Sequence, residues 1–257
     1  NDFRNGVPMK FRHVLSRIQF QGINKDAANG LVVEIRNIKL VNIASKSALT
    51  FPAIPTGDGF DWANYKPWET ATTPAWFYGT QGDAINLTAT AKNITFGDDF
   101  YMIPQSLTAA DAESMQAAST AKQYVSFQIR VKKGATASDL VSSFANTNDM
   151  IYPYAKNADG KFLNGTQYTA LQTAGTLTGI DLCTGEEWGW AAVPFEAVWQ
   201  PGKQYIYTLN YSAGGVGLTD PEDGVTPGED ILPDSPVQLF FTVDVIDWDQ
   251  EQDSKTL

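Results

Sequence analysis

The sequence predicts an all-β fold, an antiparallel β-sandwich with long loop insertions and one or two short helices. Three observations predict it. Apolar and polar residues alternate with a period of two along several segments, which places the apolar side chains on one face of each strand. Loops rich in glycine, proline, asparagine and aspartate separate these segments, without the alternating helices that accompany a parallel sheet. Hydrophobic residues make up 43% of the chain, enough for a core between two sheets.

Four strands are predicted in the first half of the chain. The segment 9–20, MKFRHVLSRIQF, changes its apolar face near Ser16, which indicates a β-bulge. The segment 30–43, GLVVEIRNIKLVNI, is long and rich in β-branched residues. Shorter strands are expected at 85–96 and 100–107.

The most regular alternation lies at 124–134. A buried face and a solvated face are typical of antiparallel sheets. The residues predicted to face inward are Val125, Phe127, Ile129 and Val131, and those predicted to face outward are Ser126, Gln128, Arg130 and Lys132.

An aromatic strand is predicted after the turn at Pro201 and Gly202, because proline presets φ and glycine tolerates positive φ. Its apolar face carries Tyr205, Tyr207, Leu209 and Tyr211. The final strand is predicted at 237–248, as an edge strand or as a donor strand that moves between subunits. Its residues predicted to face inward are Val237, Leu239, Phe241, Val243 and Val245.

Helix signals are weak. A short helix is predicted within 108–119, with Thr108 or Asp111 as its N-cap, and another at 136–145, with Ser138 as its N-cap. We expect residues 1–257 to form a single elaborated sandwich domain, although this length also allows two domains. Loop insertions are expected at about 52–83 and 134–189, and an acidic loop at 217–236.

Charge and cysteine content exclude some classes of protein. The net charge of −11 disfavours nucleic acid as a partner, because such binding needs clustered lysine and arginine. Cys183 is the only cysteine, so no intrachain disulfide can form. No apolar run approaches the ~20 residues that span a bilayer. The chain begins without methionine and without a visible signal peptide, which predicts a processed or truncated product.

The sequence predicts no catalytic, cofactor-binding or metal-binding residues. His13 is the only histidine, so we expect a structural, partly buried ring. Glu186 and Glu187 are the alternative, as an acid pair of a hydrolase, but adjacent residues of a strand point to opposite faces. The carboxylates of the loop 217–236 lack the spacing of a calcium loop. We expect that loop to be solvated, with an adventitious cation site as the alternative.

Aromatic residues gather in the first insertion. They predict either a loop held against the sandwich by its aromatic side chains or a platform for stacking sugars. The residues of this candidate glycan-binding or adhesion surface are Trp62, Trp68, Trp76 and Tyr78.

Four blocks of sequence resemble the fimbrillin-like family, the Mfa-like or FimA-like type V pilins of the bacterial cell surface. VPMKFRHVLSRIQF (7–20) resembles its F-x-H-x-L-S-x-I-x-F strand, and FYMIPQSL (100–107) resembles its IPQ strand. WGWAAVPFEAVWQPGKQYIYTLNY (188–211) resembles its W-x-P-G-K-x-Y-x-Y strand, and FTVDVIDWD (241–249) resembles its closing V-x-x-W strand. The blocks occur in family order and bracket nearly the whole chain.

The resemblance implies a transthyretin-like sandwich and a structural or adhesive role. It implies subunits that are exported as lipoproteins, trimmed by a protease and polymerised by strand exchange at the outer membrane or in the fimbrium. The expected partners are other fimbrial subunits, in a homo- or hetero-polymer, and surface glycans or proteins, with membrane contact only through a lipid anchor on the precursor. No counterpart of the family's N-terminal domain is found, so the chain resembles mainly the C-terminal domain. A glycan-binding module of the same sandwich class is the alternative function.

Overall fold

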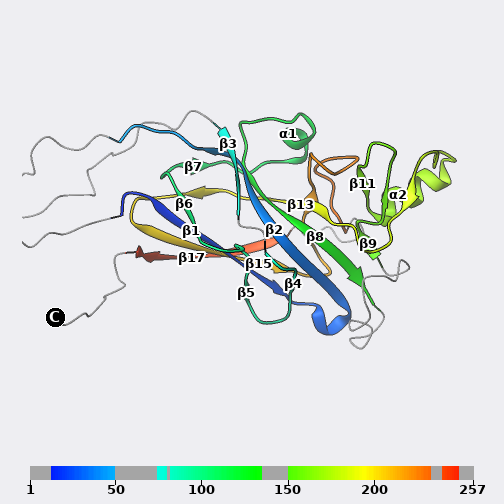
Figure 1. The fold of residues 1–257 in the computed structure, drawn as a ribbon, viewed down its shortest axis with the longest axis horizontal. Coiled ribbons are helices and arrows are strands. Elements are labelled where there is room, and N and C mark those ends of the chain that lie inside the picture. Colours follow the sequence, from blue (N-terminus) through cyan, green and yellow to red (C-terminus); the bar gives the residue numbers. More distant parts are fainter. Residues whose placement is uncertain (1–12, 50–73, 80–81, 135–149, 233–238, 249–257) are drawn as a thin grey trace, which may run out of the picture.

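Two β-sheets pack against each other in the computed structural model, which describes residues 13–49, 74–79, 82–134, 150–232 and 239–248 (Figure 1). The first sheet has the order β17-β15-β1-β5, and β6 also pairs with β1. The β1–β15 pair is parallel, and the other pairs of this sheet are antiparallel. Its strands are β1 (Ser16–Asn24), β5 (Lys92–Asn93), β6 (Phe100–Met102), β15 (Lys203–Tyr211) and β17 (Phe240–Asp247).

The second sheet has the order β16-β13-β8-β2-β3, with β4 paired to β2 and β9 paired to β8. All of its pairs are antiparallel. Its strands are β2 (Leu31–Ala44), β3 (Pro74–Tyr78), β4 (Ile85–Asn86), β8 (Tyr124–Lys133), β9 (Met150–Tyr152), β13 (Gly189–Pro194) and β16 (Leu218–Thr219). The prediction of an all-β sandwich with few helices is confirmed.

Shorter elements surround the sandwich. Strands β10, β11 and β12 form a small sheet that lies near α2 at one end of the molecule, and β7 pairs with β14 (Figure 1). No helix in the described part of the chain is long and apolar enough to cross a membrane. The remaining elements are η2 (Ala27–Asn29), α1 (Ala112–Gln116), α2 (Gly165–Thr173), β7 (Ser106–Leu107), β10 (Ala155–Lys156), β11 (Phe162–Leu163), β12 (Asp181–Leu182) and β14 (Ala197–Val198).

The core between the sheets centres on Phe20 of β1, which is 1% exposed. Its ring meets the edge of Phe127, from β8 of the second sheet, at a centroid distance of 6.1 Å. It also stacks on Tyr207 of β15 at 5.4 Å and meets the rings of Phe100 and Phe195 edge to face. Such aromatic contacts add to the free energy of apolar burial, so Phe20 links the two sheets.

The aromatic strand after Pro201 is confirmed as β15. Gly202 has a φ of 68°, as the predicted turn requires. Tyr205, Tyr207, Leu209 and Tyr211 are all buried, between 0% and 5% exposed. The hydroxyl of Tyr207 accepts a hydrogen bond of 2.9 Å from Nε1 of Trp199, which satisfies a buried donor.

The inward face of β8 is confirmed, but its outward face is not uniformly solvated. Val125, Phe127, Ile129 and Val131 are at most 1% exposed, as predicted. Ser126 and Lys132, however, are 0% and 1% exposed. Other segments cover part of this face of the sheet. The alternation of residues along a single strand cannot show where such covering segments pack.

Two predicted strands are interrupted. The segment 85–96 forms only β4 and β5, and 100–107 forms only β6 and β7. Phe96 and Gly97, with φ values of 58° and 111°, end the first segment and separate it from the second. The first strand begins at Ser16, so the described residues 13–15 are not part of a strand, and the predicted β-bulge near Ser16 is absent from the β1 pairs.

Asp111, one of the two predicted caps, is the N-cap of α1. Its side chain accepts a hydrogen bond from the Ser114 N–H. The helix α2 was not predicted. It lies within the segment expected to be an irregular insertion and begins at a capping box formed by Asn164 and Gln167. The helix predicted at 136–145 lies outside the described residues.

Candidate functional site

The strand β17 lies at the end of the first sheet in the described part of the chain. It pairs with β15 along eight residue pairs, among them Tyr207 with Val243 and Tyr205 with Val245. Directly opposite residues of an antiparallel pair point to the same face. The two valines therefore point to the same side of the sheet as the buried tyrosines, which is the side of the core.

The core side of β17 is only partly covered, in contrast to the prediction of a buried face. Leu239 and Phe241 are partly buried and pack against the core, as predicted. Val243 and Val245 are 44% and 51% exposed, although they lie opposite the buried Tyr207 and Tyr205. Val237 lies outside the described residues. Among the described residues, β17 thus combines a strand edge with an exposed apolar strip, the two features that a further strand would complete.

Aromatic stacking holds the C-terminal end of β17. The ring of Trp248 stacks on His13 at a centroid distance of 3.6 Å and on Tyr101 of β6 at 5.4 Å. Trp248 N–H also donates to Gly202 O at 2.9 Å. His13 is exposed, so the prediction of a partly buried ring was wrong, and its described role is to stack on Trp248.

Each of the four sequence blocks supplies a strand to the first sheet. They supply β6, β1, β15 and β17, which pair in that order. Side chains also join them: Ser16 Oγ of the first block donates to Gln200 O of the third at 2.8 Å. Gln105 of the second block exchanges two hydrogen bonds with the backbone of Ala44, at 3.0 and 3.2 Å, and so reaches β2 of the second sheet.

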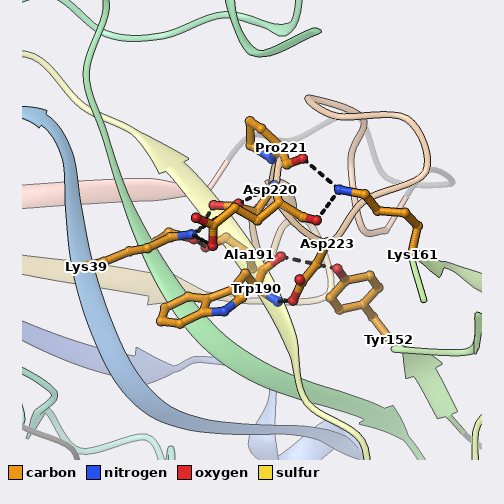
Figure 2. A network of polar contacts seen from close by, with 10 residues as sticks. Lys39, Tyr152, Lys161, Trp190, Ala191, Asp220, Pro221 and Asp223 are labelled. Carbon is orange, nitrogen blue, oxygen red and sulfur yellow. Dashed lines mark hydrogen bonds and ion pairs between the residues drawn. The ribbon is translucent and has the colours of Figure 1, made fainter. Parts of the chain in front are cut away.

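A buried polar network lies beside β13 and includes part of the acidic loop (Figure 2). Lys39 of β2 and Asp220, which follows β16, are both 0% exposed. Lys39 Nζ lies 3.3 Å from Asp220 Oδ1 and 2.6 Å from Glu222 Oε2. The prediction of a solvated acidic loop was therefore wrong for Asp220, since Lys39 compensates its charge.

Neighbouring residues complete this network. Asp223 Oδ2 accepts from Trp190 N at 3.1 Å, and Tyr152 OH donates to Trp190 O at 3.2 Å. Burial raises the pKa of Asp223 and that of Tyr152. Lys161 Nζ donates to the carbonyl oxygens of Pro221 and Glu222. Within the described residues, no three His, Cys, Asp or Glu side chains are grouped to hold a metal ion.

Most of the predicted glycan-binding surface cannot be placed. Trp62 and Trp68 lie outside the described residues. Trp76 and Tyr78 lie on β3, which pairs with β2, and their side chains are outside the described part. That surface stays a prediction.

The alternative acid pair is separated. Glu186 is exposed, whereas Glu187 Oε2 accepts hydrogen bonds from Thr184 N at 2.8 Å and Gly185 N at 3.2 Å. Burial opposes ionisation of Glu187, but hydrogen bonds, including those from Thr184, outweigh it and lower the pKa. An ionised carboxylate that caps its own turn is poorly suited to act as a general acid.

Trp188 follows the alternative acid pair, where it could serve as a sugar-stacking aromatic of a hydrolase, but its ring is occupied by two cations. Arg130 and Arg36 place their guanidinium carbons 4.2 and 4.4 Å from its ring centroid. Arg130 also pairs with Glu34 at 2.5 Å. The two cations cover the Trp188 ring, so we assign it a structural role in holding the 183–190 segment against β2 and β8.

Cys183 is expected to be unreactive in the folded protein. It is 1% exposed, and burial raises the pKa of its thiol to about 12. Because the thiolate is the reactive form, a thiol reagent such as DTNB should react slowly in buffer at neutral pH and stoichiometrically in denaturant. Rapid stoichiometric reaction of the native protein would contradict this buried position.

Comparisons with known proteins gave solved structures only: no family model and no curated protein matched. A fimbrial protein from Bacteroides vulgatus is similar at 11% identity and a TM-score of 0.44, over 96% of this chain and 59% of that chain. A candidate cell adhesion protein from Parabacteroides distasonis is similar at 11% identity and a TM-score of 0.40, over 94% and 54%. One from Bacteroides uniformis has 11% identity and a TM-score of 0.31, over 94% and 53%.

This chain therefore spans between half and two thirds of the length of these proteins.

Proposed function

We propose that this chain is a structural or adhesive subunit of a bacterial cell-surface fimbria, and that it joins other subunits noncovalently by β-strand exchange. The observation that carries the proposal is β17, whose outer edge is unpaired within the described residues and lies beside the exposed, core-side Val243 and Val245. Two further observations support it: the four blocks that resemble the fimbrillin-like family, and the strand that each block supplies to the first sheet.

The physical argument starts from the two binding contributions of an added strand. Its backbone would continue the hydrogen-bond ladder of β17, and its alternate side chains would cover the valines. Fully burying an apolar side chain contributes roughly 1.5–3 kcal/mol, so a strand with four or five such residues gains on the order of 6–15 kcal/mol before its ordering cost. That gain is sufficient for a persistent noncovalent polymer.

The localisation follows from the same proposal. The subunit would lie in the fimbrium at the outer bacterial surface, with a lipid anchor on its precursor as the only contact with the membrane. A glycan-binding role of the Trp62, Trp68 and Trp76 segment stays the alternative. It predicts binding on a glycan array that alanine at those positions removes.

Assembly tests the proposal. After proteolytic trimming, the wild-type protein should give heat-sensitive ladders on gels and filaments in electron micrographs. The double variant Val243→Lys, Val245→Lys should give neither, because lysine ammonium groups cannot enter an apolar strip without a large desolvation cost. Its free energy of unfolding should change by no more than about 0.5 kcal/mol per substitution, since both positions are exposed.

Val198→Lys is the matched control. Val198 is 63% exposed and lies on β14, outside the first sheet, so this variant should assemble normally. A trimmed wild-type protein that stays monomeric, or equal assembly of the double variant and the control, would contradict strand exchange at β17.

A further inference from the structure

The amine of Lys39 and the carboxyl group of Asp220 are held together away from water. Their atoms Nζ and Oδ1 are 3.3 Å apart, and both side chains are 0% exposed. The ring of Trp190 lies 4.4 Å from Nζ. The Glu222 carboxylate lies 2.6 Å from the same amine, and its side chain is 33% exposed. One amine therefore contacts two carboxyl groups, that of Asp220 (Figure 2) and that of Glu222, and the second is partly exposed.

The sheet register creates this arrangement. Lys39 of β2 is paired with Ser126 of β8, Ser126 with Ala192 of β13, and Ala192 with Leu218 of β16. Asp220 follows two residues after Leu218 and its N–H donates to Trp190 O, so it comes close to Lys39 on the second sheet although the two residues are far apart in sequence. The positions are fixed by backbone pairing and not by flexible loops alone.

Two donors polarise the Asp220 carboxyl group. Ser126 Oγ donates to Oδ2 at 2.6 Å, and the Glu222 N–H donates to Oδ1 at 2.9 Å. Fixed donors of this kind stabilise negative charge that develops on a carbonyl oxygen under nucleophilic attack. The site thus contains a nucleophile, an electrophile, a proton acceptor and an oxyanion donor within contact distance.

We propose that Lys39 and Asp220 condense to an intramolecular amide bond, with Glu222 carrying the protons. A proton first passes from the Lys39 ammonium group through Glu222 to Oδ1 of Asp220, which leaves a neutral amine and a carboxylic acid. The lone pair of Nζ then attacks Cγ, and the C=O electron pair moves to Oδ2, where the Ser126 hydroxyl holds it.

The second half of the step releases water. The Glu222 carboxylate takes a proton from Nζ and transfers it to the Oδ1 hydroxyl, and the Cγ–Oδ1 bond breaks as the Oδ2 pair reforms the carbonyl. The sum is one ammonium and one carboxylate converted into one amide and one water. No oxidant, reductant or cofactor takes part.

The surroundings favour this reaction at the Lys39–Asp220 pair over the other described lysine–aspartate pairs. A buried ion pair has a high desolvation cost, which an uncharged amide avoids, and fixed contact replaces a bimolecular encounter. The ion pairs Lys122–Asp111 and Lys203–Asp247 are partly solvated, so they stay ionic. The amide would tie β2 to the chain that follows β16, and this inference does not depend on the proposed fimbrial function.

The intact mass of the purified full chain tests the proposal. The wild-type protein should be lighter than its sequence by the mass of one water molecule, and protease digestion should yield a branched peptide that joins Lys39 to Asp220. A succinimide cannot account for the loss at this aspartate, because Pro221 has no backbone N–H to form it. A wild-type mass equal to that of the sequence, or a loss at another residue, would overturn the proposal.

Variants test the roles of the residues. Glu222→Gln should have the full mass of its sequence, without the loss of water, while its circular dichroism spectrum stays native. The control Lys203→Met should still lose one water. Equal water loss in Glu222→Gln would overturn the role of Glu222. The Asp220–Pro221 bond provides a second measurement: a free aspartate side chain promotes acid cleavage there, so the wild-type protein should resist it and Lys39→Met should not.

Discussion

Replacing Phe20 by alanine is expected to lower the free energy of unfolding by about 3–5 kcal/mol, as found for large-to-small substitutions of buried aromatic residues. Phe20 is 1% exposed and contacts the rings of Phe100, Phe127, Phe195 and Tyr207 from both sheets. The alanine variant loses these contacts and leaves a cavity at the centre of the sandwich. Urea denaturation followed by tryptophan fluorescence measures the loss.

Two variants make this result specific. Phe20→Leu retains much of the buried volume and should cost less than Phe20→Ala. Val198→Ala removes methyl groups from a side chain that is 63% exposed and should change stability by at most about 0.5 kcal/mol. A loss below about 1 kcal/mol for Phe20→Ala would contradict a core centred on Phe20.

The aromatic strand β15 shows how much of the fold follows from local sequence. A proline–glycine turn and a period-two pattern predict both the strand and its buried face, and the four apolar residues are indeed buried. The same reasoning succeeds for the inward face of β8 and for the Asp111 cap. In each case the information lies within about ten residues of chain, so no knowledge of distant segments is required.

Burial of polar residues depends on distant segments, and sequence patterns fail there. Ser126 and Lys132 alternate as solvated residues would, yet both are buried. Lys39 lies in β2 beside other polar residues, Glu34, Arg36 and Asn37, so its position in the sequence does not single it out as buried. Its partners Asp220 and Glu222 follow more than 180 residues later, in a segment that composition alone indicates as a solvated loop.

The edge strand shows the converse case. The pattern of 237–248 correctly predicts a strand and places Val243 and Val245 on the core side of the sheet. Whether a core-side residue is covered depends on how far the opposite layer extends, and no pattern within the strand encodes that length. The exposed valines, which carry the proposed function, therefore could be found only from the structure.

Removing the Lys39 amine is expected to cost about 3–5 kcal/mol, because Lys39→Met leaves the Asp220 carboxylate buried without its cation. The polar contacts of Asp220 with Ser126 and the Glu222 N–H remain, but they do not neutralise its charge. Where Lys39 and Asp220 are joined by an amide, the same variant also removes the cross-link, so the expected loss is at least as large. Chemical denaturation of folded wild-type and variant protein measures it.

A second substitution separates charge from packing. Lys39→Met combined with Asp220→Asn removes both charges while the asparagine can keep the hydrogen bond from Ser126, so it should recover part of the lost stability. Lys203→Met breaks the solvated pair with Asp247 and should cost no more than about 1 kcal/mol. Equal losses for Lys39→Met and Lys203→Met would mean that Asp220 keeps access to water, and both the buried network and its condensation would then be wrong.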